Sequence, residues 1–163
     1  MPKVAIVMGS VSDLDVVKPT IEILKKFDVE AEVRVISAHR TPDMAHDFAK
    51  SAIDNNIEVI ICAAGKAAHL GGVIAAYTPL PVIGLPVKSS TMDGLDSLLS
   101  MVQMPSGIPV ACVAINGGLN AGLLAVQILS VKYPTLMKKM QDYKISMAEK
   151  IKNEDEKLQK ELN

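Results

Sequence analysis

Aromatic residues are scarce in this sequence: tryptophan is absent, and phenylalanine and tyrosine make up only 3% of the 163 residues. Proteins that hold single-stranded nucleic acid stack its bases on aromatic rings, so such a role is disfavoured. An excess of positive charge is missing too, because 17 Lys and Arg stand against 18 Asp and Glu for a formal net charge of -1. The chain therefore lacks the basic field that draws proteins onto nucleic acid or anionic lipid.

Cysteine and long apolar runs are equally scarce. Cys62 and Cys112 lie in apolar runs without a CxxC spacing or a nearby histidine, which indicates buried free thiols rather than a disulfide or a zinc site. No apolar stretch reaches the ~18 residues of a membrane span. The start, MPKVAIVMGS, lacks the regions of a signal peptide. We expect a cytoplasmic protein without a membrane segment.

Short β-branched runs alternate with segments of helical periodicity, which is typical of a parallel sheet wrapped by helices. The predicted strands are 3–8, 32–36, 58–62, 81–85 and 109–114, and the helices are about 14–27, 42–55, 67–77, 93–103 and 118–132. The first, third and fifth strands are almost wholly apolar, so we expect helices on both of their faces. The pattern predicts an α/β fold: a three-layer α/β/α domain whose five-stranded parallel sheet has the flavodoxin-like order 2-1-3-4-5.

One domain should span residues 1–163, with a core at about 3–132 and a helical extension at about 133–163. The extension carries one apolar stripe of a long amphipathic helix, formed by Leu136, Met140, Tyr143, Met147 and Ile151. Its last twelve residues, KNEDEKLQKELN, read as a solvated or frayed end. In the first helix, Pro19 predicts either a kink or a helix that begins there.

Ligands of open α/β sheets bind beyond the carboxyl ends of the strands, so the turns that follow the strands are the places to search. The first turn offers Ser10, Ser12 and Asp13 at a helix start, where free N–H groups favour an anion. Either these side chains only cap the helix, or they bind phosphate and ribose. Arg40 in the neighbouring second turn favours phosphate, because guanidinium groups bind phosphate bidentately.

The second turn places His39 before a helix that Thr41 caps and Pro42 begins. A histidine at a strand end can give and take a proton near neutral pH, which makes His39 a candidate general acid and base. His46 falls inside the following helix and is interpreted as a surface residue.

The third turn is almost without bulk, since small residues surround His69: Ala63, Ala64, Gly65, Ala67, Ala68, Gly71 and Gly72. Such residues either let the backbone approach a planar ligand closely or pack a helix tightly against the sheet. Lys66 and Lys88 are interpreted as solvated side chains without a role.

Six segments together carry a family resemblance. They are VAIVMGSVSD at 4–13, SAHRTP at 37–42, AAGKAAHLGGVIAA at 63–76, PVIGLPV at 81–87, DSLLSMVQMPSGIPV at 96–110 and NAGLLAVQIL at 120–129. In this order they resemble the N5-carboxyaminoimidazole ribonucleotide mutases, the class I, bacterial-type PurE family, over about residues 3–132. The resemblance implies an isomerase of de novo purine biosynthesis. It moves the substrate's carboxylate from the exocyclic nitrogen to ring carbon C4 by decarboxylation, retention of CO2 and recarboxylation.

The resemblance also implies roles for particular residues. His39 is the single proton shuttle; Ser10, Ser12, Ser37 and Arg40 hold phosphate, and Asp13 holds the ribose hydroxyls. Ala64, Gly65, Ala67 and His69 line the pocket for the aminoimidazole and the transferred carboxylate. Neither a cofactor nor a metal is implied. The implied partners are the ribonucleotide substrate, copies of the chain in a homo-octamer, and an ATP-dependent carboxyaminoimidazole ribonucleotide synthetase as the upstream enzyme.

Two alternatives stay open. A related branch carboxylates aminoimidazole ribonucleotide directly with CO2; it typically reads AHKT and AGRSN where this chain reads AHRT and AAHL, which favours the mutase. A regulatory module that binds the nucleotide without chemistry would use the same phosphate turn. The third turn departs from the frequent AGGAAHLPG, because Lys66 replaces a glycine and Gly71 a proline.

Overall fold

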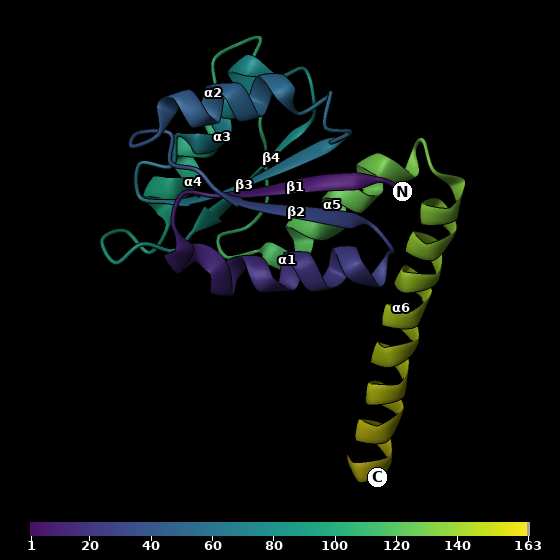
Figure 1. The fold of residues 1–163 in the computed structure, drawn as a ribbon. Helices are drawn as coiled ribbons and strands as arrows, with labels where there is room; N and C mark the ends of the chain where they lie inside the picture. The colour runs from purple at the N-terminus through teal and green to yellow at the C-terminus, as the bar shows by residue number, and fades with distance from the viewer. Residues whose placement is uncertain (163) are drawn as a thin grey trace.

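The computed structural model describes residues 1–162 and shows one five-stranded sheet with helices on both faces (Figure 1). The strands are β1 Lys3–Met8, β2 Glu30–Val35, β3 Val59–Gly65, β4 Val82–Val87 and β5 Ala111–Cys112. All pair in parallel in the order β2-β1-β3-β4-β5. The predicted fold class and strand order are confirmed. Because all strands run the same way, their five following turns share one edge of the sheet.

The helices form the two outer layers. They are α1 Leu14–Lys26, α2 Pro42–Ser51, α3 Leu70–Tyr77, α4 Leu95–Val102, α5 Gly118–Ser130 and α6 Pro134–Leu162, with a short 3-10 helix, η1, at Val11–Asp13. Buried side chains of α1 and α5 pack on one face of the sheet, and those of α2, α3 and α4 pack on the other. β1 serves both layers: Val4 and Ile6 face α1 and α5, whereas Ala5 and Val7 face the opposite layer.

The strand predicted at 109–114 is wrong in extent and in burial. Only Ala111 and Cys112 form β5, and they are exposed and half-buried respectively. β5 is an edge strand that pairs with β4 alone, and Pro109 has no N–H for a ladder. The strand buried along its whole length is instead β4, which lies between β3 and β5.

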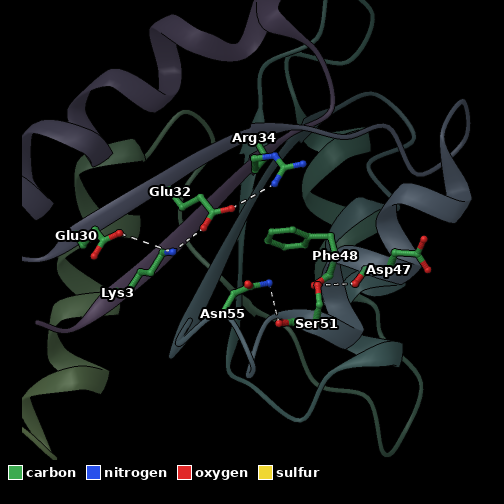
Figure 2. Close-up of polar contacts among 8 residues, drawn as sticks. All are labelled: Lys3, Glu30, Glu32, Arg34, Asp47, Phe48, Ser51 and Asn55. Carbon is green, nitrogen blue, oxygen red and sulfur yellow. Dashed lines mark hydrogen bonds and ion pairs between the residues drawn. The ribbon is translucent and has the colours of Figure 1, made fainter.

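The other edge strand, β2, begins two residues before its predicted start because Glu30 N donates to the Pro2 carbonyl at 2.9 Å. Figure 2 shows the ion pairs that its Glu32 makes. Lys3 Nζ of the neighbouring β1 is 2.8 Å from Glu32 Oε2, and Arg34 Nη1 of β2 itself is 3.3 Å from Glu32 Oε1. Charges of both signs along an edge strand discourage its pairing with another sheet. The edge is therefore protected rather than covered.

The second helix ends earlier than the sequence predicts. α2 stops at Ser51, whose carbonyl accepts from the side-chain amide of Asn55 at 3.0 Å (Figure 2). Asn56 then takes a left-handed φ of 59°, the conformation that commonly ends a helix. α1 differs in the other direction: it starts at Leu14 and continues through Pro19, so the helix does not begin at the proline.

The predicted C-terminal helix exists, but only its first part packs on the domain. Leu136 and Met140 are buried, and the Tyr143 ring meets the Phe27 ring edge-on at 5.7 Å between centroids. From Met147 onward the stripe is exposed, and Figure 1 shows α6 extending away from the sheet. The last residues are solvated as expected, but they are helical to Leu162 rather than frayed. None of the helices within residues 1–162 combines the length and apolarity of a membrane span.

Candidate active site

A pocket of about 620 Å³ opens at the carboxyl edge of the sheet, within the usual range of small-molecule sites. It is formed by the turns after β1, β2, β3 and β4. All ten residues proposed from the sequence line it: Ser10, Ser12, Asp13, Ser37, His39, Arg40, Ala64, Gly65, Ala67 and His69. The structure thus brings together side chains separated by up to 59 positions of the chain, while their chemical roles remain proposals.

In the first turn, the Asp13 carboxylate does not serve as a helix cap. The Ser10 hydroxyl caps η1 by accepting from Ser12 N at 3.3 Å and from Ser12 Oγ at 2.9 Å. Asp13 precedes α1, yet its carboxylate makes no capping hydrogen bond to that helix. Burial raises the pKa of Asp13, partly offset by a backbone hydrogen bond from Ser10. A desolvated carboxylate of this kind is suited to accept hydrogen bonds from ligand hydroxyls.

The second turn is closed by Thr41 and carries Arg40 toward the first turn. Thr41 Oγ1 accepts from Ser37 N at 3.0 Å and donates to the Ser37 carbonyl at 2.9 Å, so the five-residue loop is fixed. Arg40 Nε donates to Ser37 Oγ at 3.3 Å, and its Nη2 donates to the Gly9 carbonyl at 3.1 Å. The guanidinium therefore bridges the turns after β1 and β2.

His39 and His69 are hydrogen-bonded to each other. His39 Nε2 lies 2.8 Å from His69 Nδ1, and the rings stand nearly perpendicular at 88° with 4.9 Å between centroids. One of these nitrogens must donate and the other accept, so the bond holds one proton between two rings. The pairing was not predicted. The signal for it was the predicted strand order, which places the turns after β2 and β3 on either side of β1, with one histidine in each.

His46, which the sequence predicts to be a surface residue, lies outside this pocket and is half-buried beside the Tyr77 ring, at 4.7 Å between centroids. Its Nδ1 is 2.9 Å from Asp47 Oδ1. Within residues 1–162, no group of three or more His, Cys, Asp or Glu side chains is placed to hold a metal ion.

The lysines without a predicted role are both in the pocket wall. Lys66 follows Gly65 in the third turn, and Lys88 follows β4 together with Ser89 and Ser90. Lys88 Nζ pairs with Asp93 Oδ1 at 3.1 Å, whereas the Ser89 hydroxyl donates to Asp96. Sequence reasoning could have found them, because the predicted strand order already placed the turn after β4 beside the turn after β3.

Comparison with known proteins agrees with this architecture. A family model described as AIR carboxylase matches residues 3–150. The chain belongs to the AIR carboxylase family. A family member from Thermotoga maritima named N5-carboxyaminoimidazole ribonucleotide mutase is 53% identical over 98% of this chain and 93% of its own length. The crystal structure of Treponema denticola PurE superposes with a TM-score of 0.89 at 32% identity, covering 97% of this chain and 99% of that one.

Other members of the AIR carboxylase family carry a different activity name. The chloroplastic phosphoribosylaminoimidazole carboxylase of Vigna aconitifolia is 52% identical over 94% of this chain, but that match covers 28% of the plant protein. Identity alone therefore does not separate the two names. The mutase-named relative has nearly the same length as this chain, whereas the carboxylase-named one contains a large further region.

Proposed function

We propose that this protein is an isomerase of de novo purine biosynthesis that converts N5-carboxyaminoimidazole ribonucleotide into 4-carboxy-5-aminoimidazole ribonucleotide. The observation that carries the proposal is the hydrogen-bonded pair His39–His69 in a pocket with Arg40 at one side. A phosphate-binding group and a proton carrier on one sheet edge are what this reaction requires. Membership of a family whose full-length relatives are named for the mutase supports the same substrate class.

The substrate phosphate binds at the turns after β1 and β2, to Ser10, Ser12, Ser37 and Arg40. These groups are hydroxyls and a guanidinium, the usual partners of phosphate oxygens. The carboxylate of Asp13 accepts from the ribose hydroxyls. A ribonucleotide bound in this way lies across the sheet edge, and its ring extends past the histidine pair toward the turn after β3.

The reaction moves a carboxylate from the exocyclic nitrogen to C4 and a proton from C4 to that nitrogen. Protonated His39 gives its proton to the exocyclic nitrogen, the carboxylate C–N bond breaks, and CO2 forms. Ring carbon C4 attacks this CO2, and His39, now neutral, takes the C4 proton. Atoms and protons balance, so no ATP or redox partner is consumed. The wall of Ala64, Gly65 and Ala67 leaves room for CO2 beside the ring, where its high effective concentration favours recapture.

Turnover of the synthesised carbamate ribonucleotide, followed by ultraviolet absorbance without ATP, tests the activity. Rapid conversion is expected, and binding without conversion would mark the chain as a non-catalytic nucleotide-binding module. The direct carboxylase is distinguished by a single turnover in labelled bicarbonate. Mutase chemistry gives a product with little label, whereas a product labelled in proportion to the bulk pool would assign the chain to direct carboxylation of aminoimidazole ribonucleotide.

Homo-oligomerisation belongs to this proposal. Leu95, Leu99 and Val102 form an exposed apolar stripe on α4, and Ile151 on α6 is 64% exposed. Apolar helix faces of this kind bury themselves against another surface. The family resemblance favours an octamer, and sedimentation of a 17.4 kDa monomer at micromolar concentration would contradict it.

The proposal also includes the extent of the domain, the upstream enzyme and the cellular location. The unit that carries the activity is a single domain, with its core at about 3–132 and a helical extension at about 133–163, whose last residue lies outside the described part of the chain. Its substrate is a product of an ATP-dependent carboxyaminoimidazole ribonucleotide synthetase, which acts upstream in the cytoplasm.

A further inference from the structure

Lys66 stands apart from every other residue with a left-handed backbone in residues 1–162. Five non-glycine residues there have positive φ: Asp28, Asn56, Asp93, Asn116 and Lys66, the last at 57°. Four of them are Asp or Asn, whose short polar side chains tolerate this conformation. Lys66 has a long side chain and no such compensation. Backbone strain of this kind persists where the surrounding structure imposes it, and it clusters at functional sites.

The surroundings of the three left-handed residues at the ligand edge differ as well. Asn116 Oδ1 accepts from Lys88 N at 2.8 Å, and Asp93 forms an ion pair with Lys88 at 3.1 Å. These two side chains therefore stabilise the turns in which they lie. The Lys66 ammonium has no hydrogen-bond or ion-pair partner among the described residues, although it lines the pocket. Lys66 is exposed in the pocket wall, so its charge is available to a ligand.

Among the described residues, three basic side chains line this pocket, and Lys66 is the one that has no hydrogen-bond or ion-pair partner. Arg40 donates to Ser37 Oγ and to the Gly9 carbonyl, and Lys88 is paired with Asp93. The strand order β2-β1-β3-β4-β5 places Arg40 on the β2 side of the pocket and Lys66 on the β3 side, with the His39–His69 pair linking these two turns. A ligand with anionic groups at its two ends matches this distribution of charge.

We infer that Lys66 is a specificity-determining residue that binds the transferred carboxylate of the ribonucleotide, opposite the end where the phosphate binds. The inference rests on the proposed function, which supplies a ligand with a phosphate at one end and a carboxylate at the other. Lys66 then contributes to binding of the substrate and the product, which both carry the carboxylate. It does not contribute to binding of the same ribonucleotide without the carboxylate. Because the ammonium is exposed, the contact is worth less than a buried ion pair.

The test compares two ligands that differ only in the carboxylate, 4-carboxy-5-aminoimidazole ribonucleotide and aminoimidazole ribonucleotide, by calorimetric titration. Lys66→Gln should weaken binding of the carboxylated ligand by about five- to tenfold, and should leave the affinity for the other ligand unchanged. Lys66→Arg should keep the discrimination. Lys66→Gly removes the charge and also the strain, so it should bind like Lys66→Gln while unfolding at a higher temperature.

A matched control is Lys50→Gln, which neutralises an exposed lysine at the far end of α2, outside the pocket. It should bind both ligands like the wild type. Equal losses for both ligands in Lys66→Gln, or no loss for either, would overturn the inference. If the wild-type protein binds neither ligand, the proposed function itself fails, which the unsubstituted chain reveals before any variant is compared.

Discussion

Replacement of His39 is the sharpest test of the proton shuttle. In His39→Asn the pocket keeps Arg40, Ser10 and Asp13, whose proposed contacts are to parts of the ligand that do not react. Affinity should therefore change by no more than a few-fold. The variant loses the only proposed proton carrier that contacts the reacting atoms, and positioned acid–base groups contribute about 10²–10⁴-fold to rate. That range equals about 2.7–5.4 kcal/mol of transition-state stabilisation.

His69 provides the comparison that separates proton transfer from positioning. Its Nδ1 lies 2.8 Å from His39 Nε2, and an asparagine side chain can place an amide group near the position of that Nδ1. If His69 only orients His39, His69→Asn should retain nearly full activity. His69→Ala should then lose about two- to thirteen-fold, the equivalent of one net hydrogen bond of ~0.5–1.5 kcal/mol. If His69 receives the proton, both variants should fall by about 100-fold or more.

The assay is pre-steady-state turnover of the carbamate ribonucleotide, with affinity measured separately by calorimetry. Thermal unfolding of each variant shows that the fold is intact; His39 and His69 are both exposed, so small changes are expected. A His39→Asn variant that keeps more than about a tenth of the wild-type rate lies outside the expected range, and would refute the assignment of His39 as the shuttle.

Three further predictions concern binding and stability. Arg40→Ala should weaken ribonucleotide binding by about ten- to a hundredfold in calorimetry, because it removes the proposed charge-assisted hydrogen bonds to the phosphate; an unchanged affinity would contradict the phosphate assignment. Burial raises the pKa of Asp13 above its ordinary value of 3.8, so the ionised carboxylate destabilises the fold above the folded-state pKa. Asp13→Asn should therefore be more stable than wild type in denaturant unfolding at about pH 7. That advantage should shrink as the pH falls through the raised folded-state pKa and should be gone below 3.8, the ordinary pKa of the carboxyl; a constant difference would refute it. Gly118→Ala places a Cβ 2.1 Å from the Val16 carbonyl of α1, and should lower the free energy of unfolding by at least about 2 kcal/mol. The control is Gly72→Ala, whose Cβ meets only the flexible end of a methionine side chain. Its free energy of unfolding should stay within about 1 kcal/mol of wild type.

The sequence was sufficient for the layers and the strand order, because β-branched runs and helical periodicity are local signals. β1 was predicted to the residue, since its apolar run is bounded by Lys3 and by the glycine of the first turn. The errors lie where tertiary contacts decide. β2 gains Glu30 through a hydrogen bond to the carbonyl of Pro2, just before the first strand, and α2 loses residues to a side-chain cap from Asn55. Neither partner can be identified from periodicity.

The site was predictable for a different reason. In a parallel sheet every turn that leads from a strand to a helix lies at the same edge, so the strand order predicts which of these turns are neighbours in space. That argument placed Arg40 beside the first turn, and the same argument applied one strand further would have placed Lys88 in the pocket wall. The orientation of rings is not contained in the strand order. The contact between His39 and His69 depends on rotamers, which a list of neighbouring turns does not specify.

The overlooked lysine shows how an exposed charge should be interpreted in a turn. The sequence alone predicts a solvated side chain for Lys66, because lysines are usually exposed. Its left-handed φ of 57° changes this interpretation, since a glycine there would give the same turn without strain. A residue that breaks a local conformational rule at the edge of a pocket is best explained by what its side chain contributes to that pocket. The binding comparison of two ribonucleotides that differ by one carboxylate measures that contribution directly.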